Sequence, residues 1–156
     1  MKLLKLSITT LGALIVIACS RESPESQLPP KAVAITASDE MKFDVRAFEV
    51  KPGQKVQLTV KNIGKLPKET MGHVVAVLGW NTDAAKFVEA GLAHPETDFI
   101  APDQQPKMLA HTKLLGPGES DTINFTAPRI PGSYDFLCIF PGHFASGMKG
   151  TMTVAY

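Results

Sequence analysis

From residue 33 onward, hydrophobic and polar positions follow one another in short runs separated by turn residues. Residues 56–60 alternate strictly between apolar and polar side chains, which is the period of a strand with one buried face. Residues 73–78 form an apolar run that begins with a histidine, as expected of a central strand. Further strands are predicted at residues 33–37, 41–50, 108–114, 121–126, 133–137 and 149–155.

Proline–glycine pairs provide the turns between several of these runs, at Pro52-Gly53, Pro117-Gly118 and Pro131-Gly132. One short helix is expected over residues 83–90, because Ala84, Phe87 and Val88 share a helical face there. Asn81 or Thr82 is the expected cap at its start, and Gly91 the expected stop. Seven to eight short strands with one helical insertion predict an all-β fold, a Greek-key β-sandwich.

The first eighteen residues follow a different pattern. Lys2 and Lys5 precede a mostly apolar stretch over residues 6–18, which is the layout of an export signal peptide. The stretch is shorter than the roughly 20 apolar residues of a spanning helix. Residues 16–19 (Val-Ile-Ala-Cys) resemble a bacterial lipobox, so residues 1–18 are predicted to be removed and Cys19 to carry lipid. An ordinary signal peptide beside an unrelated cysteine is the alternative.

The remaining chain divides into a tether and one domain. Residues 19–31 are polar and proline-rich and are predicted to form a flexible, lipidated tether, whereas residues 32–156 form the domain. Removal of Lys2 and Lys5 changes the formal net charge from +1 to −1. No basic stripe is present, so nucleic acid is not an expected partner. The predicted location is the periplasm or the extracytoplasmic face of a bacterial membrane, held there by the lipid on Cys19.

Four side chains with soft or borderline metal-binding atoms carry the candidate chemistry. Cys138, His143 and Met148 lie in one loop-forming segment after a predicted strand, and His73 begins another strand. One thiolate, two imidazoles and one thioether are the ligand set of a mononuclear electron-transfer copper site. The sequence therefore predicts one copper ion, cycling between Cu(I) and Cu(II), and no catalytic residues.

Simpler explanations exist for each ligand alone. A lone cysteine is usually a small buried hydrophobe, Met148 could be core packing, and His73 could be an ordinary buried histidine. The four together are hard to explain in this way. Zinc is the competing metal, but structural zinc sites seldom use a thioether, so copper is preferred.

Three segments of the chain are distinctive: Leu66-Pro-Lys-Glu-Thr-Met-Gly-His73, Leu109-Ala-His-Thr-Lys-Leu114 and Cys138-Ile-Phe-Pro-Gly-His143. They resemble the azurins, which are blue copper proteins of the cupredoxin class, and the likeness extends over residues 33–156. Four residues separate His143 from Met148, one more than in azurin itself, and this loop together with the predicted lipid is similar to auracyanin.

The resemblance implies that His73, Cys138 and His143 surround copper in a plane, with Met148 as the axial ligand. It implies a weak contact from the Gly72 carbonyl on the opposite side. The resemblance also implies that the backbone N–H groups of Val74 and Phe140 donate hydrogen bonds to the thiolate.

Two positions depart from the family together. Where azurins carry an asparagine and a hydroxyl residue that hydrogen bond, this chain has Val74 and Ile139. The hypothesis is a drier thiolate that disfavours Cu(II) and raises the reduction potential. Asn62 replaces a buried histidine that titrates in some azurins, so no proton coupling is expected there.

The implied function is electron transfer between redox proteins, such as c-type cytochromes or respiratory and photosynthetic complexes that dock near His143. One edge of its ring is expected at the surface within an apolar patch drawn from Leu66, Pro67, Met71, Met41, Phe140, Pro141 and Phe144. Copper capture or delivery at the cell surface is the alternative function. A copper enzyme would need a second cluster, for which His94 and His111 are poorly spaced.

Overall fold

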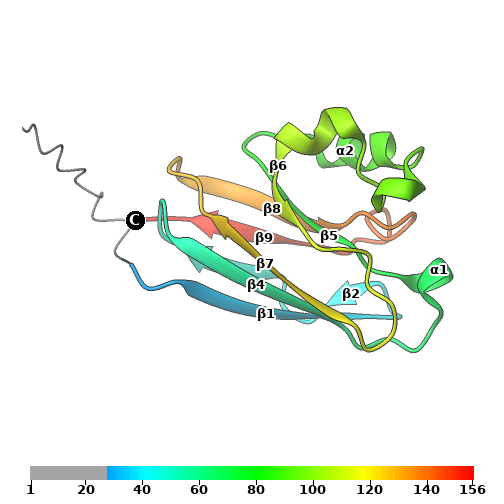
Figure 1. Ribbon diagram of the computed structural model, residues 1–156. Coiled ribbons are helices and arrows are strands. Elements are labelled where there is room, and N and C mark those ends of the chain that lie inside the picture. Colours follow the sequence, from blue (N-terminus) through cyan, green and yellow to red (C-terminus); the bar gives the residue numbers. More distant parts are fainter. Residues whose placement is uncertain (1–27) are drawn as a thin grey trace, which may run out of the picture.

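The structure, a computed structural model, describes residues 28–156 and shows two β-sheets packed face to face (Figure 1). The predicted signal peptide, Cys19 and most of the predicted tether lie outside these residues. One sheet has the strand order β2-β1-β4-β7 and the other β3-β9-β8-β5-β6. Their bounds are β1 Lys31–Ser38, β2 Lys42–Phe43, β3 Ala47–Val50, β4 Lys55–Asn62, β5 Val75–Leu78, β6 Met108–His111, β7 Ser120–Thr126, β8 Gly132–Cys138 and β9 Lys149–Val154. The predicted all-β Greek-key sandwich is confirmed.

The strand predicted over residues 41–50 is divided into β2 and β3, which belong to different sheets. Asp44 explains the break, because its carboxylate accepts hydrogen bonds from the backbone N–H groups of Thr36 (2.6 Å) and Val45 (2.8 Å). These bonds turn the chain out of one sheet and let it cross to the other. The described chain therefore has nine strands, one more than the sequence pattern predicts.

In the described part of the chain, two α-helices and two 3₁₀ segments accompany the sheets: α1 Lys68–Met71, α2 Ala84–Gly91, Pro95–Thr97 and Pro102–Lys107. The predicted helix is α2, but its cap is Asp83, whose carboxylate accepts from the N–H groups of Ala85 and Lys86 at 3.1 and 3.2 Å. Gly91 is the last residue of α2 and is not its stop. A side chain there would overlap the backbone carbonyl of Phe99, so the helix packs tightly on the chain that follows.

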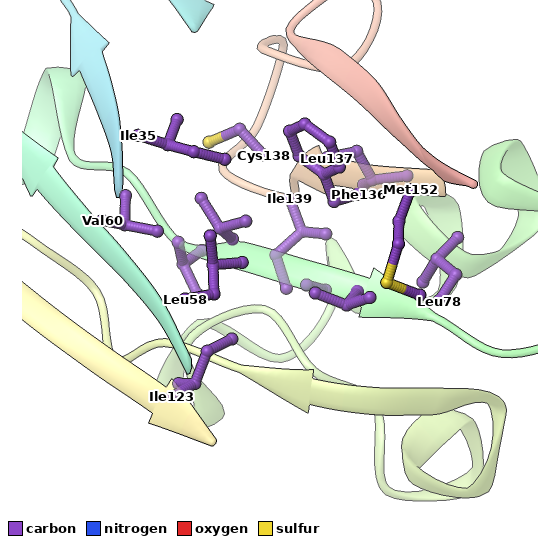
Figure 2. Packing of buried hydrophobic residues seen from close by; sticks show 14 of the residues in the cluster. Ile35, Leu58, Val60, Leu78, Ile123, Phe136, Leu137, Cys138, Ile139 and Met152 are labelled. Atoms are coloured by element: carbon purple, nitrogen blue, oxygen red, sulfur yellow. The ribbon is translucent and has the colours of Figure 1, made fainter. Parts of the chain in front are cut away.

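The core lies between the two sheets and encloses the end of β8. Figure 2 shows Leu58, Val60 and Ile123 of the first sheet on one side of the core. On the other side are Phe136, Leu137 and Cys138 of β8, with Ile139 directly after the strand. Tyr134, Phe136 and Cys138 share a face at period two, and all three are buried. Cys138 is therefore held in rigid, apolar surroundings that exclude water. Within residues 28–156, no helix is long and apolar enough to cross a membrane.

Candidate metal centre

Neighbouring strands of one sheet position Cys138 and His73. Cys138 is the last residue of β8 and lies opposite Val75, the first residue of β5. His73 comes just before β5 and not within it, and forms an isolated bridge with Leu115. In this bridge the His73 N–H donates to the Leu115 carbonyl at 3.0 Å, and the Leu115 N–H donates back at 2.8 Å. The backbone of His73 is thus fixed on both sides.

The loop after Cys138 folds back on itself and brings the other two predicted ligands to the same place. The N–H of Met148 donates to the His143 carbonyl at 3.0 Å, and the N–H of Cys138 donates to the Met148 carbonyl at 3.0 Å. Gly142 and Gly147 both have φ of +85°, a conformation that side chains other than glycine rarely adopt. These two glycines allow the loop to be this tight.

The three nitrogen and sulfur ligands converge. Sγ of Cys138 lies 3.3 Å from Nδ1 of His143 and 3.8 Å from Nδ1 of His73. All three ligand atoms lie within 4.8 Å of one another, close enough to share one ion. Cys138 and His73 are fully buried, His143 is 2% exposed, and Met148 is 1% exposed.

The electrostatics of the pocket suit a cation. Burial raises the pKa of the Cys138 thiol to about 12, although hydrogen bonds from the backbone of Phe140 and Val74 oppose the shift. Burial, with the neighbouring His73, lowers the pKa of His143 to about 4. The pKa of His73 is also lowered by burial, against the opposing effects of Asp39 and the Ser38 backbone. A protonated imidazole is disfavoured here, and a bound cation would compensate the charge of the thiolate.

Backbone contacts also bear out the expected support for the sulfur. The groups that hydrogen bond it belong to Val74 and Phe140, the residues that the azurin likeness implies. Gly72 is buried directly before His73, and a Cβ there would lie 2.5 Å from the Lys68 carbonyl and 2.8 Å from Leu114. Only glycine fits at this position without moving the chain that carries His73.

Two supporting residues were not predicted from the sequence. The buried Asn62 donates from Nδ2 to the Leu115 carbonyl at 3.1 Å, the same carbonyl that accepts the His73 N–H. The buried Thr112 accepts at its hydroxyl from the Val75 N–H at 3.0 Å. Each of these two polar residues lies at the end of a largely apolar stretch, which is a weak signal of a buried role. Their hydrogen-bond partners, Leu115 and Val75, are distant in the sequence and could not be read from it.

The remaining histidines do not join the cluster. Nδ1 of His94 lies 3.1 Å from Oε1 of Glu96. His111 is exposed, with Nδ1 3.0 Å from the carbonyl oxygen of Thr112. Among the described residues, the histidine, cysteine and carboxylate side chains yield a single possible metal-binding group, formed by His73, Cys138 and His143.

Comparison with known proteins identifies the metal. A family model described as copper binding proteins, plastocyanin/azurin family, matches residues 31–155. This chain belongs to that family. It is 35% identical over 125 residues to azurin of Pseudomonas fluorescens biotype C, covering 78% of this chain and 96% of that one. It is 33% identical over 125 residues to outer membrane protein H.8 of Neisseria gonorrhoeae, covering 79% and 67%.

Solved structures agree. Reduced auracyanin from the photosynthetic bacterium Roseiflexus castenholzii superposes with a TM-score of 0.73 at 38% identity, covering 81% of this chain and 98% of that one. The chain is therefore a blue copper protein of the cupredoxin fold, and its cofactor is copper. The buried thiol, two imidazoles and thioether fit that ion on the chemistry of the donor set alone.

The residues on either side of His143 in this copper protein are apolar, and the ring itself is almost enclosed. Only 2% of His143 is exposed, so a very small part of the ring reaches solvent. Phe140 is buried against it, with ring centroids 4.9 Å apart, and is core. The surface candidates that remain exposed or half-buried, here called the metal-end patch, are Met41, Leu66, Pro67, Met71, Pro141 and Phe144.

Val74 and Ile139 are buried and adjacent, with the Ile139 N–H donating to the Val74 carbonyl at 2.9 Å. We expect the double substitution Val74→Asn with Ile139→Thr to lower the reduction potential of the copper protein, because polar groups beside Cys138 would favour the more charged Cu(II) state. Voltammetry of the copper-loaded chain measures this potential. Ile139→Val is the matched control and should leave it near the parent value; an unchanged or higher potential in the double variant would contradict the explanation.

Proposed function

We propose that this blue copper protein is anchored by lipid to a bacterial membrane and carries single electrons between redox proteins on its extracytoplasmic side. In this proposal His73, Cys138 and His143 bind copper, and Met148 is the fourth ligand. The single observation that carries it is the convergence of three ligand atoms within 4.8 Å in a buried pocket. When bound, copper supplies a one-electron Cu(I)/Cu(II) couple.

The protein's own residues favour fast electron transfer because they hold the ligand positions nearly fixed. Backbone bonds on both sides of His73, and those that link Cys138, His143 and Met148, fix the positions of the donors before any ion is bound. The close-packed core prevents large movements and keeps water from the sulfur. Little rearrangement would then be needed for each electron, and the proposed route for the electron is the His143 ring, which packs against Phe140.

Copper capture or delivery is the competing function, and burial argues against it. Sites that pass on metal need accessible ligands, whereas Cys138 is fully buried and Met148 is 1% exposed. Reversible one-electron cycling with fast exchange, and slow loss of copper to a chelator, would support the carrier. Rapid copper transfer with slow electron exchange would support delivery.

Anchoring follows from the N-terminal sequence. We propose that residues 1–18 are a lipoprotein signal peptide, that Cys19 is lipidated, and that residues 19–31 tether the copper domain of residues 32–156. A relative named an outer membrane protein supports an envelope location for this chain. The partners proposed are c-type cytochromes or respiratory and photosynthetic complexes in the same compartment.

Met71→Glu tests the metal-end patch as the docking surface. Met71 is half-buried in the segment that leads to His73, and a charge there should slow electron exchange with partners that dock through an apolar contact. Stopped-flow oxidation of the reduced copper protein by a c-type cytochrome measures the rate. Asn124→Glu adds the same charge on β7, outside the metal-end patch, and should have little effect. A changed copper spectrum in Met71→Glu, or equal rates in both variants, would argue against this surface.

A further inference from the structure

The end of the sandwich opposite the copper ligands is where the described chain begins and where its last strand ends. β1 starts and β9 finishes at this end, and α1 lies at the other (Figure 1). The carbonyl of Pro29 accepts a hydrogen bond from Nε2 of Gln54 at 2.9 Å, which holds the entering chain against the 51–54 turn. Along β8, the six steps from Gly132 to Cys138 span roughly 20 Å. We call this the tether end.

Three large apolar side chains are exposed at the tether end. Trp80 is 55% exposed, Ile130 is 53% exposed and Tyr156 is 83% exposed. We call these three residues the tether-end patch.

Contacts in the structure tie the three positions together. The Trp80 ring lies against Gly132, where a side chain would overlap it, and packs on Tyr134 with centroids 5.7 Å apart. The Tyr134 hydroxyl donates to the Ile130 carbonyl at 2.8 Å. Gly132 pairs with Val154, two residues before Tyr156. The three residues of the patch therefore lie at the same end of the β8–β9 ladder.

The predicted anchor is attached to the chain at this end of the domain. Cys19 precedes residue 28 by nine residues, which span at most about 30 Å when fully extended. A lipid on Cys19 would keep the tether end within that distance of the bilayer, and the copper ligands lie at the opposite end of β8. Tryptophan and tyrosine combine an apolar ring with a polar group and are favoured at the level of lipid headgroups.

We propose that the tether-end patch rests on the lipid surface and orients the domain so that the metal-end patch faces away from the membrane. The inference rests on the proposed lipid anchor and adds a second contact to it. The anchor alone would let the domain rotate freely. The added contact would present the His143 side to partners in the aqueous compartment, which gives the two apolar surfaces of the molecule different roles.

Trp80 is the only tryptophan in the chain, so its fluorescence reports on this surface alone. The protein, purified as the cell processes it and with reduced copper bound, would be added to phosphatidylethanolamine–phosphatidylglycerol vesicles with and without bromine on the acyl chains. We expect a blue shift of the emission on vesicles and a loss of intensity with brominated lipid. The matched control combines Trp80→Phe with Leu66→Trp, which moves the single reporter to the metal-end patch and should show neither effect.

Flotation of the vesicles and mass spectrometry of the Cys19 peptide separate the two claims. Lipid on Cys19 and flotation with unquenched Trp80, or equal quenching at position 66, would overturn the orientation and leave the anchor standing. Flotation and quenching of Trp80 without lipid would refute the anchor and support the patch as a membrane contact by itself. No flotation would overturn the inference. A blue shift that needs high protein concentration and no vesicles would assign the patch to a second copy of the chain and would overturn it as well.

Discussion

Replacing Cys138 with serine should abolish the intense visible absorption of the copper-loaded protein. The band arises from charge transfer between a thiolate and Cu(II), and Cys138 is the free cysteine of the described chain. An alkoxide is harder to form than a thiolate, above all at a position that already raises the thiol pKa to about 12. The two imidazoles and the thioether would remain and could hold copper only weakly. An absorption spectrum of the copper-loaded variant, taken beside the parent protein, is the measurement.

His111→Ala is the control for this experiment. That ring is exposed and lies outside the ligand cluster, so the variant should keep the full band. Circular dichroism of both variants checks that the fold survives, since a buried hydroxyl in place of the thiol costs roughly 1–3 kcal/mol unless it finds a hydrogen bond. A strong blue band in Cys138→Ser, with the fold intact, would disprove the proposed ligand set.

The fold could be predicted because its information is local. Alternation at period two along residues 56–60 and the proline–glycine turns need no knowledge of tertiary partners. The division of residues 41–50 could not be predicted in this way. It depends on Asp44 reaching the backbone of Thr36, and nothing in the local pattern shows that contact. The four-residue helix α1 was missed as well, because so short a helix depends on its surroundings and not on propensity.

The metal site, too, was predictable from the sequence only in part. Cys138, His143 and Met148 come from one segment, so their chemistry and spacing were visible together, and His73, at the start of an apolar run, completed the ligand set. The residues that brace His73 were not visible. Asn62 meets it only through the Leu115 carbonyl, which brings together three segments that are distant in the sequence. The ligands can be predicted from residue types and spacing, whereas the hydrogen bonds that position them depend on the tertiary fold.

Phe136→Ala should greatly lower the free energy of unfolding. The ring is fully buried on β8 and contacts Phe43 and Phe48, with centroids 5.7 and 5.4 Å apart. Removing a buried phenylalanine leaves a cavity and typically costs about 3–5 kcal/mol. Urea unfolding of the metal-free chain measures the change, free of any contribution from copper. Ser133→Ala, at an exposed position of the same strand, should change the free energy of unfolding little.

Substitutions at Gly150 test whether the Phe136 ring packs as the structure shows. Gly150 lies opposite Phe136 in the ladder between β8 and β9, and a Cβ there would overlap the Phe136 ring and lie 2.6 Å from the Arg46 carbonyl. Gly150→Ala alone should therefore destabilise the fold, but much less so when Phe136→Ala has already removed the ring. The double variant should be more stable than the sum of the single losses implies, and the remaining deficit belongs to the Arg46 contact. Strictly additive losses in the free energy of unfolding would show that a side chain at position 150 does not clash with the Phe136 ring.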